Sequence, residues 1–216
     1  MVTKTNETIA VAAPNILTAS FDIEGTAPYV QHKFSAKTKQ EMLKAQMSGL
    51  KNKNRKKTDA RKPNEEFEEA TYKMIEPGKK KPSYGIPAPA FRAAMISACR
   101  LVGFQMTKAK LSVFVEQDGI DIEDATPLVK IEGKRTMLES NVRLANGTAY
   151  INFRTMWQEW KAKVKVRFDA DQFSIGDVAN LLTRVGLQVG VGEGRPDSKT
   201  SNGMGWGLFQ ISNAES

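Results

Sequence analysis

The chain has 216 residues, of which 40% are hydrophobic, so it is long enough to bury a substantial core. Its formal net charge of +8 and its pI near 9.5 favour an anionic partner. A single cysteine excludes an intramolecular disulfide. The chain has neither a signal-peptide pattern nor a run of the roughly 20 apolar residues that cross a bilayer, so we expect a cytoplasmic protein without membrane contact.

The first predicted element is a strand at residues 16–25, ILTASFDIEG, in which apolar residues alternate. The segment PYVQHKFS follows as a loop or strand extension, and Ser35 then caps a predicted helix. In this part of the chain Lys33 and Lys37 are candidate phosphate contacts. His32 lies beside them, but an isolated histidine is more often a structural or surface residue.

A basic insertion is predicted at about residues 44–83. Residues 44–81 hold twelve Lys or Arg and six Asp or Glu, which is +6 of the total charge. We expect a flexible, exposed arm that contacts nucleic acid, and the alternative is a solvated arm that only keeps the chain soluble. Within the insertion NEEFEEATYKMI predicts a short helix or strand, and PGKKKPSYG predicts coil. The candidate contacts are Lys53, Arg55, Lys56, Lys57, Arg61 and Lys62, with Tyr84 beside the arm as a stacking ring.

The segment IPAPAFRAAMISACRLVG predicts the first core helix, with prolines at its start and Gly103 at its end. On this helix Arg92 is a candidate nucleic-acid contact, and an ordinary surface charge is the alternative. A β-rich insertion at about residues 109–156 is predicted to contain the strands KAKLSVFVEQ, TPLVKIEG, RTMLESNVRL and TAYINFRTM. The acidic run DGIDIED lacks the spacing of a calcium loop, so we expect a solvated hairpin tip.

Strict alternation from Trp160 to Phe168 predicts a strand with one apolar face and one cationic face. Side chains two residues apart on a strand are about 6.7 Å apart, close to the step between phosphates on an extended single strand. We therefore expect the cationic face to follow a nucleic-acid backbone. The alternatives are a solvated strand face and lysines that protect a sheet edge. The cations are Lys161, Lys163, Lys165 and Arg167.

A second helix is predicted with Ser174 as its N-cap and Gly186 just past its end. The glycine-rich segments GVGEGRP and GMGWGLFQI follow and lead into a closing strand. A dinucleotide-binding fingerprint follows a strand and opens a helix, and the order here is the reverse. A loop that needs glycines only for turning is one alternative. The candidate contacts in this loop are Gly192, Gly194, Arg195 and Trp206.

The glycine-rich loop before the last strand resembles the RAMP superfamily, the RNA-binding proteins of CRISPR systems. The phrase IPAPAFRAAMISACR, with Arg92 and Arg100, also resembles the proline-containing entry to a basic helix in that family. The resemblance implies an α+β fold with a ferredoxin-like or RRM-like βαββαβ core in a single domain over residues 1–216. It also implies self-association and other subunits of a nucleoprotein complex. The segment GVGEGRP, followed by a strand that is preceded by GWG, resembles phage-encoded proteins of this type, which implies a bacterial or phage-infected host cell.

The sequence therefore predicts a non-enzymatic protein that binds RNA or single-stranded DNA through backbone contacts, as an oligomer along the strand. We expect no cofactor and no metal site, because His32 is the only histidine. Some RAMP proteins are metal-independent endoribonucleases that use a histidine near the N-terminus, and His32 is the candidate for that role. A phage structural or assembly protein, whose basic arm contacts nucleic acid or an acidic neighbour, is the third alternative.

Overall fold

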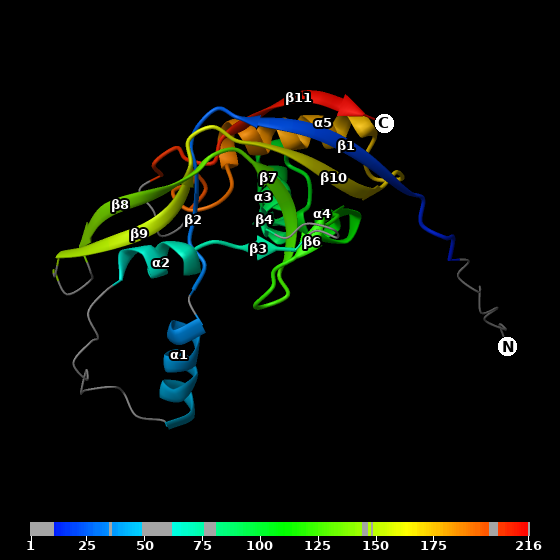
Figure 1. Ribbon diagram of the computed structural model, residues 1–216. Helices are drawn as coiled ribbons and strands as arrows, with labels where there is room; N and C mark the ends of the chain where they lie inside the picture. Colours follow the sequence, from blue (N-terminus) through cyan, green and yellow to red (C-terminus); the bar gives the residue numbers. More distant parts are fainter. Residues whose placement is uncertain are drawn as a thin grey trace, which may run out of the picture.

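The computed structural model describes residues 11–34, 36–48, 62–75, 81–143, 147, 149–198 and 203–215. In this part of the chain the fold is α+β, with helices packed on antiparallel sheets (Figure 1). None of the helices described is both long and apolar enough to cross a membrane. The predicted contacts that lie outside the described residues are Lys53, Arg55, Lys56, Lys57 and Arg61.

The larger sheet is built around β1 (Ile16–Gly25), which pairs antiparallel with β10 (Lys161–Asp169) on one side and with β11 (Phe209–Glu215) on the other. The predicted strand at residues 16–25 is confirmed. The shorter strands of this sheet are β3 (Lys73–Met74), β4 (Ser83–Pro87), β5 (Val113–Val115), β6 (Gly119–Ile120) and β7 (Pro127–Glu132).

The strands run in the order β11-β1-β10-β7-β4-β3, and β5 also pairs with β10. Lys161 at the start of β10 pairs with Glu132 of β7, whereas Val166 near its end pairs with Val115 of β5. One half of β10 is therefore flanked by β1 and β7, and the other half by β1 and β5.

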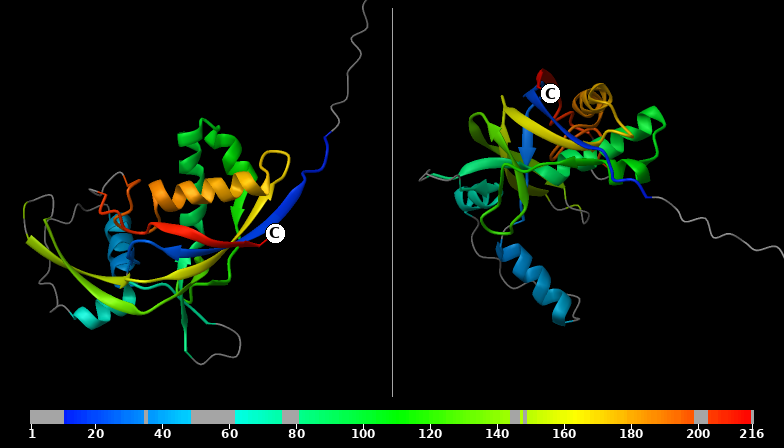
Figure 2. Two further views of the ribbon diagram at one scale, coloured as in Figure 1. Left: turned by 90° about the horizontal axis from the view of Figure 1, so that it is seen from above. Right: turned by 90° about the vertical axis from the view of Figure 1, so that its right-hand side faces the viewer.

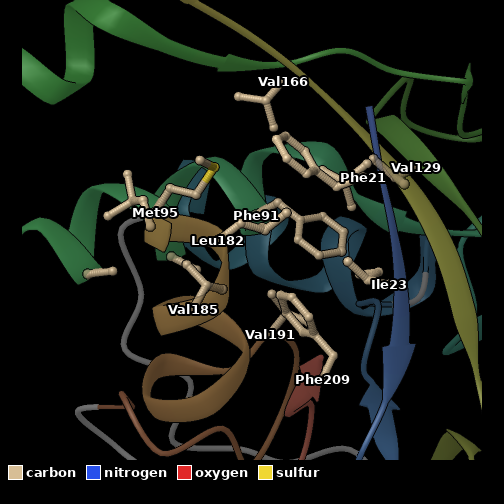
Figure 3. Close-up of a cluster of buried hydrophobic side chains, with 14 of the residues drawn as sticks. Phe21, Ile23, Phe91, Met95, Val129, Val166, Leu182, Val185, Val191 and Phe209 are labelled. Carbon is tan, nitrogen blue, oxygen red and sulfur yellow. The ribbon is translucent and has the colours of Figure 1, made fainter. Parts of the chain in front are cut away.

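Helices α3 (Ala88–Ala98) and α5 (Ile175–Arg184) cover one face of this sheet (Figure 2). The predicted alternation of β10 is confirmed, since its apolar residues are buried beneath the helices. Phe21 of β1, Phe91 of α3 and Leu182 of α5 are fully buried and meet in this core (Figure 3). The burial of such large apolar side chains is the main force that holds the helices on the sheet.

The start of α5 agrees with its prediction and Gly186 lies just past its last residue, Arg184, but a helical turn that was not predicted follows. Ser174 Oγ accepts a hydrogen bond from Asp177 N at 3.1 Å, and Asp177 Oδ2 accepts one from Ser174 N at 2.9 Å, which completes a capping box. The chain does not leave the helix at Gly186 but continues as a π-helical turn to Val189. Gly186 is needed for packing, because a Cβ there would lie 2.2 Å from the carbonyl oxygen of Phe209.

Two segments have a different secondary structure from the one expected. Residues 108–112, predicted as strand, belong to α4 (Met106–Ser112), because Ala109 and Ser112 lie one helical turn apart and are both buried. Residues 83–85, which lie in the segment PSYG predicted as coil, begin β4, and Gly85 pairs with Lys130 of β7. A neighbouring strand decides the conformation of this second segment.

The smaller sheet has the order β2 (Tyr29–Gln31), β9 (Ala149–Trp157) and β8 (Arg135–Arg143). Strands β8 and β9 form a hairpin that extends away from the core, and β7 leads into β8 as β9 leads into β10 (Figure 1). Gly133 joins β7 to β8 with a φ of 135°, and a Cβ there would lie 2.3 Å from the carbonyl oxygen of Glu159. The absence of a side chain at 133 therefore permits the bend between the sheets.

Two helices lie between β2 and β3 in the chain. Helix α2 (Pro63–Glu69) packs against β9, and helix α1 (Ala36–Ser48) projects from the body (Figures 1 and 2). The predicted helix after residue 35 is confirmed, and the segment predicted as a short helix or strand contains both α2 and β3. Arg135 of β8 fixes α2 in place by pairing with Glu68 and by lying 4.3 Å from the ring centre of Phe67.

An aromatic cluster joins the two sheets. Tyr29 of β2 lies with its ring centre 5.6 Å from those of both Trp157 and Trp160. All three are buried, and Trp160 Nε1 donates to the carbonyl oxygen of Ala27 at 2.9 Å. Burial also raises the pKa of the Tyr29 hydroxyl. This cluster holds β2 and the residues that follow it in a fixed position on the core.

Candidate nucleic-acid interface

The cation row of β10 (Lys161, Lys163, Lys165 and Arg167) lies on the side of the larger sheet away from the helices. Acidic side chains of neighbouring segments lie next to it. Lys161 Nζ lies 3.0 Å from a carboxylate oxygen of Glu24, and Lys163 Nζ lies 3.9 Å from one of Asp22. These acids occupy the directly facing positions of β1. Opposite charges across neighbouring strands stabilise each other and reduce the field that a distant phosphate experiences.

The other half of the row is also partnered. Lys165 Nζ lies 3.3 Å from Asp118, and the guanidinium carbon of Arg167 lies 5.2 Å from the ring centre of Phe114. A hollow of about 490 Å³ opens on this face, and it is lined by side chains of both signs, including Glu132 from β7. The row is therefore part of a charge-balanced surface, which favours the alternative of a solvated strand face.

Lys33 lies inside the protein, which corrects its prediction as a phosphate contact. Its Nζ donates to Asp121 Oδ2 at 2.6 Å and to Glu123 Oε2 at 2.7 Å, and the side chains of Lys33 and Asp121 are only 1% and 0% exposed. Burial lowers the pKa of Lys33, but the two carboxylates raise it more, so it lies above its ordinary value. Asp121 also accepts from the backbone N–H groups of Lys73, Glu123 and Asp124. The acidic run is therefore not a wholly solvated hairpin tip.

Two further predicted contacts are used within the fold. Arg92 donates from Nε to the carbonyl oxygen of Val113 at 2.9 Å and from Nη2 to that of Lys110, so it caps the end of α4. Tyr84 is half-buried, and the guanidinium carbon of Arg135 lies 4.6 Å from its ring centre. Both side chains are half-buried and have partners within the fold, and their contact with nucleic acid stays a prediction.

The glycine-rich loop packs tightly on β2 and on itself. Gly192 has a φ of 82°, and a Cβ there would lie 2.5 Å from the ring of Tyr29. Gly207 has a φ of 69°, and a Cβ there would lie 1.7 Å from the carbonyl oxygen of Val191. Both positions require glycine for the fold itself, whether or not a ligand approaches the loop.

Hydrogen bonds attach this loop to β2 and to α3. Glu193 N donates to the carbonyl oxygen of Val30 at 2.9 Å. At the other end of the segment Asp197 accepts from Ser97 Oγ and, at 2.7 Å, from Arg100 Nη2. These bonds hold the pKa of Asp197 below its ordinary value, the one from Ser97 most strongly. Arg100 therefore anchors the loop.

Arg195 and Trp206 lie half-buried on this loop. Arg195 Nη1 donates to the carbonyl oxygen of Gly192 at 3.0 Å, which uses one of its five N–H donors. The indole of Trp206 covers Gly194, because a Cβ at that position would lie 2.5 Å from Cε3. Trp206 is therefore packed against the loop on one side of its indole.

His32 and Arg154 lie next to the loop on its β2 side. Arg154 of β9 donates from Nε to Glu193 Oε2 at 2.8 Å, and its side chain is 13% exposed. His32 follows β2 and is exposed. Its pKa lies below the ordinary value, because partial desolvation and the nearby Arg154 guanidinium disfavour the imidazolium, while Glu193 favours it. His32 is therefore uncharged at neutral pH.

Phe34 lies beside His32, with 5.1 Å between the ring centres and an interplanar angle of 55°. It is 51% exposed, so little of its ring contributes to the core. The glycine-rich loop meets β2 and β9 here, because Glu193 binds both Val30 and Arg154. We refer to His32, Phe34, Arg154 and Glu193, together with Arg195 two residues further along the loop, as the hairpin-base site.

Sequence reasoning missed three members of this site, namely Phe34, Arg154 and Glu193. Alternation along the chain was the signal that could have identified Phe34. Tyr29, Gln31 and Lys33 are buried, whereas His32 and Phe34, which alternate with Gln31 and Lys33, are exposed. The pairing of β2 with β9, which brings Arg154 here, has no local signature.

The described residues are almost electrically neutral. They contain 22 Lys or Arg and 21 Asp or Glu, so most of the net charge of +8 lies in the segments outside them. Residues 49–61 alone hold six Lys or Arg and one Asp. Of the two predicted contacts near that segment, Lys37 belongs to α1, and Lys62 precedes α2 with its Nζ 2.7 Å from Glu65.

No protein-family model matches this chain, and no curated protein matches it. Among the residues that the structure describes, no group of three or more His, Cys, Asp or Glu side chains is arranged to hold a metal ion.

Proposed function

We propose that this protein binds single-stranded nucleic acid, either RNA or DNA, at the hairpin-base site. The observation that carries the proposal is that Arg154 of β9, which pairs with Glu193 of the glycine-rich loop, lies near the exposed His32, while Arg195 lies two residues after Glu193 on the same loop. Arginine N–H groups are strong donors to phosphate oxygens. Among the described residues, the partners of Arg154 engage its Nε and Nη1, and the partner of Arg195 engages its Nη1. The basic insertion adds attraction that does not depend on sequence.

Strand order supports a ferredoxin-like core, which is the fold of the RAMP resemblance. In the half of the sheet where β5 pairs with β10, the order is β11-β1-β10-β5, all neighbours are antiparallel, and α3 and α5 lie on one face. This order supports a βαββαβ unit to which the remaining strands and the β8–β9 hairpin are added. We extend the proposal to a RAMP-like, phage-encoded subunit that assembles along a strand in the cytoplasm.

The test is a titration of labelled single-stranded RNA and single-stranded DNA with protein purified under nuclease and high salt. We expect binding that weakens steeply between two salt concentrations, because phosphate contacts release counterions. Light scattering in the same samples should report larger particles as protein joins the strand. No binding to either polymer at moderate salt would contradict the proposal, and self-assembly without nucleic acid would then favour a structural protein.

Site variants locate the binding surface. We expect Arg195→Gln to weaken binding about tenfold and to reduce the salt slope by about one unit, as for a single phosphate contact. The matched control is Arg184→Gln, because Arg184 lies on α5, at the helix-covered face of the sheet. Equal losses in the two variants would assign the effect to overall charge rather than to this site.

A second candidate function is metal-independent cleavage of RNA. The observation that favours it is the exposed imidazole of His32, which is uncharged at neutral pH and can accept a proton, next to the Arg154 guanidinium. Prolonged incubation with labelled RNA should then give products with wild type and none with His32→Ala, while both proteins bind. Intact RNA in both reactions would contradict the cleavage function, and binding would remain the proposed function.

A further inference from the structure

The segment after β2 carries an aromatic pair that the core does not use. Phe34 is 51% exposed and lies against the exposed ring of His32. By contrast Trp157 and Trp160 are buried, and Tyr84 and Trp206 are half-buried. Within the hairpin-base site, the rings most open to a flat ligand are therefore those of His32 and Phe34.

This pair is held in place by the residue between its two members. Lys33 donates through its backbone N–H to the carbonyl oxygen of Ala70 at 3.0 Å, and its buried Nζ binds Asp121 and Glu123. With Lys33 fixed inside, the flanking side chains at 32 and 34 must both point outward. A ligand that binds there does not have to order the backbone first, which lowers the entropic cost of binding.

We propose that His32 and Phe34 form a subsite for one unpaired nucleobase, next to a phosphate contact at Arg154. Aromatic faces stack on every base, and an arginine beside them suits the phosphate of the same nucleotide. The inference rests on the proposed function and makes it more specific. The preferred ligand is a strand whose bases are accessible, rather than a duplex or another polyanion.

The test compares three fluorescein-labelled ligands of equal length: a mixed-sequence strand of about 12 nucleotides, an abasic strand and a duplex. We expect wild type to bind the base-containing strand about tenfold more tightly than the abasic strand, the size expected for one stacked base. Phe34→Ala should lose this preference and bind both strands alike. Phe34→Trp should keep it.

The matched control is Leu111→Ala, because Leu111 is 78% exposed on α4 and outside the site. It should behave as wild type, and thermal unfolding should show that each variant folds. The subsite is refuted if wild type binds abasic and base-containing strands equally, or if Phe34→Ala keeps the preference of wild type. Equal binding of both strands refutes only the subsite, whereas no binding of any strand refutes the proposed function as well.

Discussion

Cations lie beside the β-sheets in two parts of this protein, and acids pair with them in both parts, but the burial of the cations differs. On β10 the lysines recur at every second residue and face acids on β1 and near β6. Around β2 the cations come from separate segments, with Lys33 buried between two carboxylates and Arg154 held by Glu193. The comparison teaches that spacing along one strand places charges, whereas contacts with other segments decide how deeply each charge is buried.

The largest effect should come from the buried ion pair. Asp121→Ala leaves the Lys33 ammonium buried without its main partner and removes an acceptor for three backbone N–H groups. We expect a loss of about 3–5 kcal/mol in the free energy of unfolding, measured by urea denaturation.

The matched variant is Asp22→Ala, which removes an exposed acid that faces Lys163. It should cost at most about 1 kcal/mol, because exposed ion pairs contribute little. Similar losses in the two variants would remove the energetic distinction between the two regions.

The next largest effect should come from glycine in the loop that carries Arg195. Gly207→Ala places a Cβ 1.7 Å from a backbone oxygen, so the loop must shift, and we expect a loss of at least about 3 kcal/mol. Gly205→Ala has a similar φ of 74° but no heavy atom within 4 Å, so only the backbone conformation is strained, at about 1–2 kcal/mol. Thermal unfolding of both variants distinguishes close packing from turn geometry, and equal losses would contradict the packing explanation.

The elements with a local signature could be predicted from the sequence, and those set by distant partners could not. The capping box at Ser174 and the alternation of β10 are local, and both are confirmed. Strand β4 needs β7 beside it, and the burial of Asp121 needs Lys33 from a segment 88 residues away. The candidate site divides in the same way, since Arg195 stands out in a glycine-rich loop whereas Arg154 arrives through the pairing of β2 with β9.

A smaller effect is expected where a pair is removed from the charge-balanced surface. The double variant Asp22→Asn with Lys163→Gln keeps the net charge and should change the stability by less than about 1 kcal/mol. Its affinity for a single strand and its salt slope should equal those of wild type in the titration proposed above. A weaker affinity with a lower salt slope would show that the β10 row does contact phosphate, and would move the interface to the open sheet face.

The smallest effect, and the one most specific to the hairpin-base site, should come from His32. Its pKa is lower in the folded protein than in the unfolded chain, so the unfolded chain binds more protons in the window below the ordinary value of 6.5. The free energy of unfolding that depends on His32 is therefore highest above that window, and it decreases as the pH falls through the window. Because His32 is the only histidine, a His32→Asn variant should lack this dependence.

Binding should respond to the same titration in the opposite direction. Protonation of His32 adds a cation beside Arg154, so the affinity for a single strand should rise as the pH falls, in wild type and not in His32→Asn. The free energy of unfolding and the dissociation constant, measured at pH 7.5 and at pH 5.5, give both dependences. A fall in stability without a rise in affinity would mean that the imidazole is near no bound phosphate, and Arg195 would then be the contact to pursue.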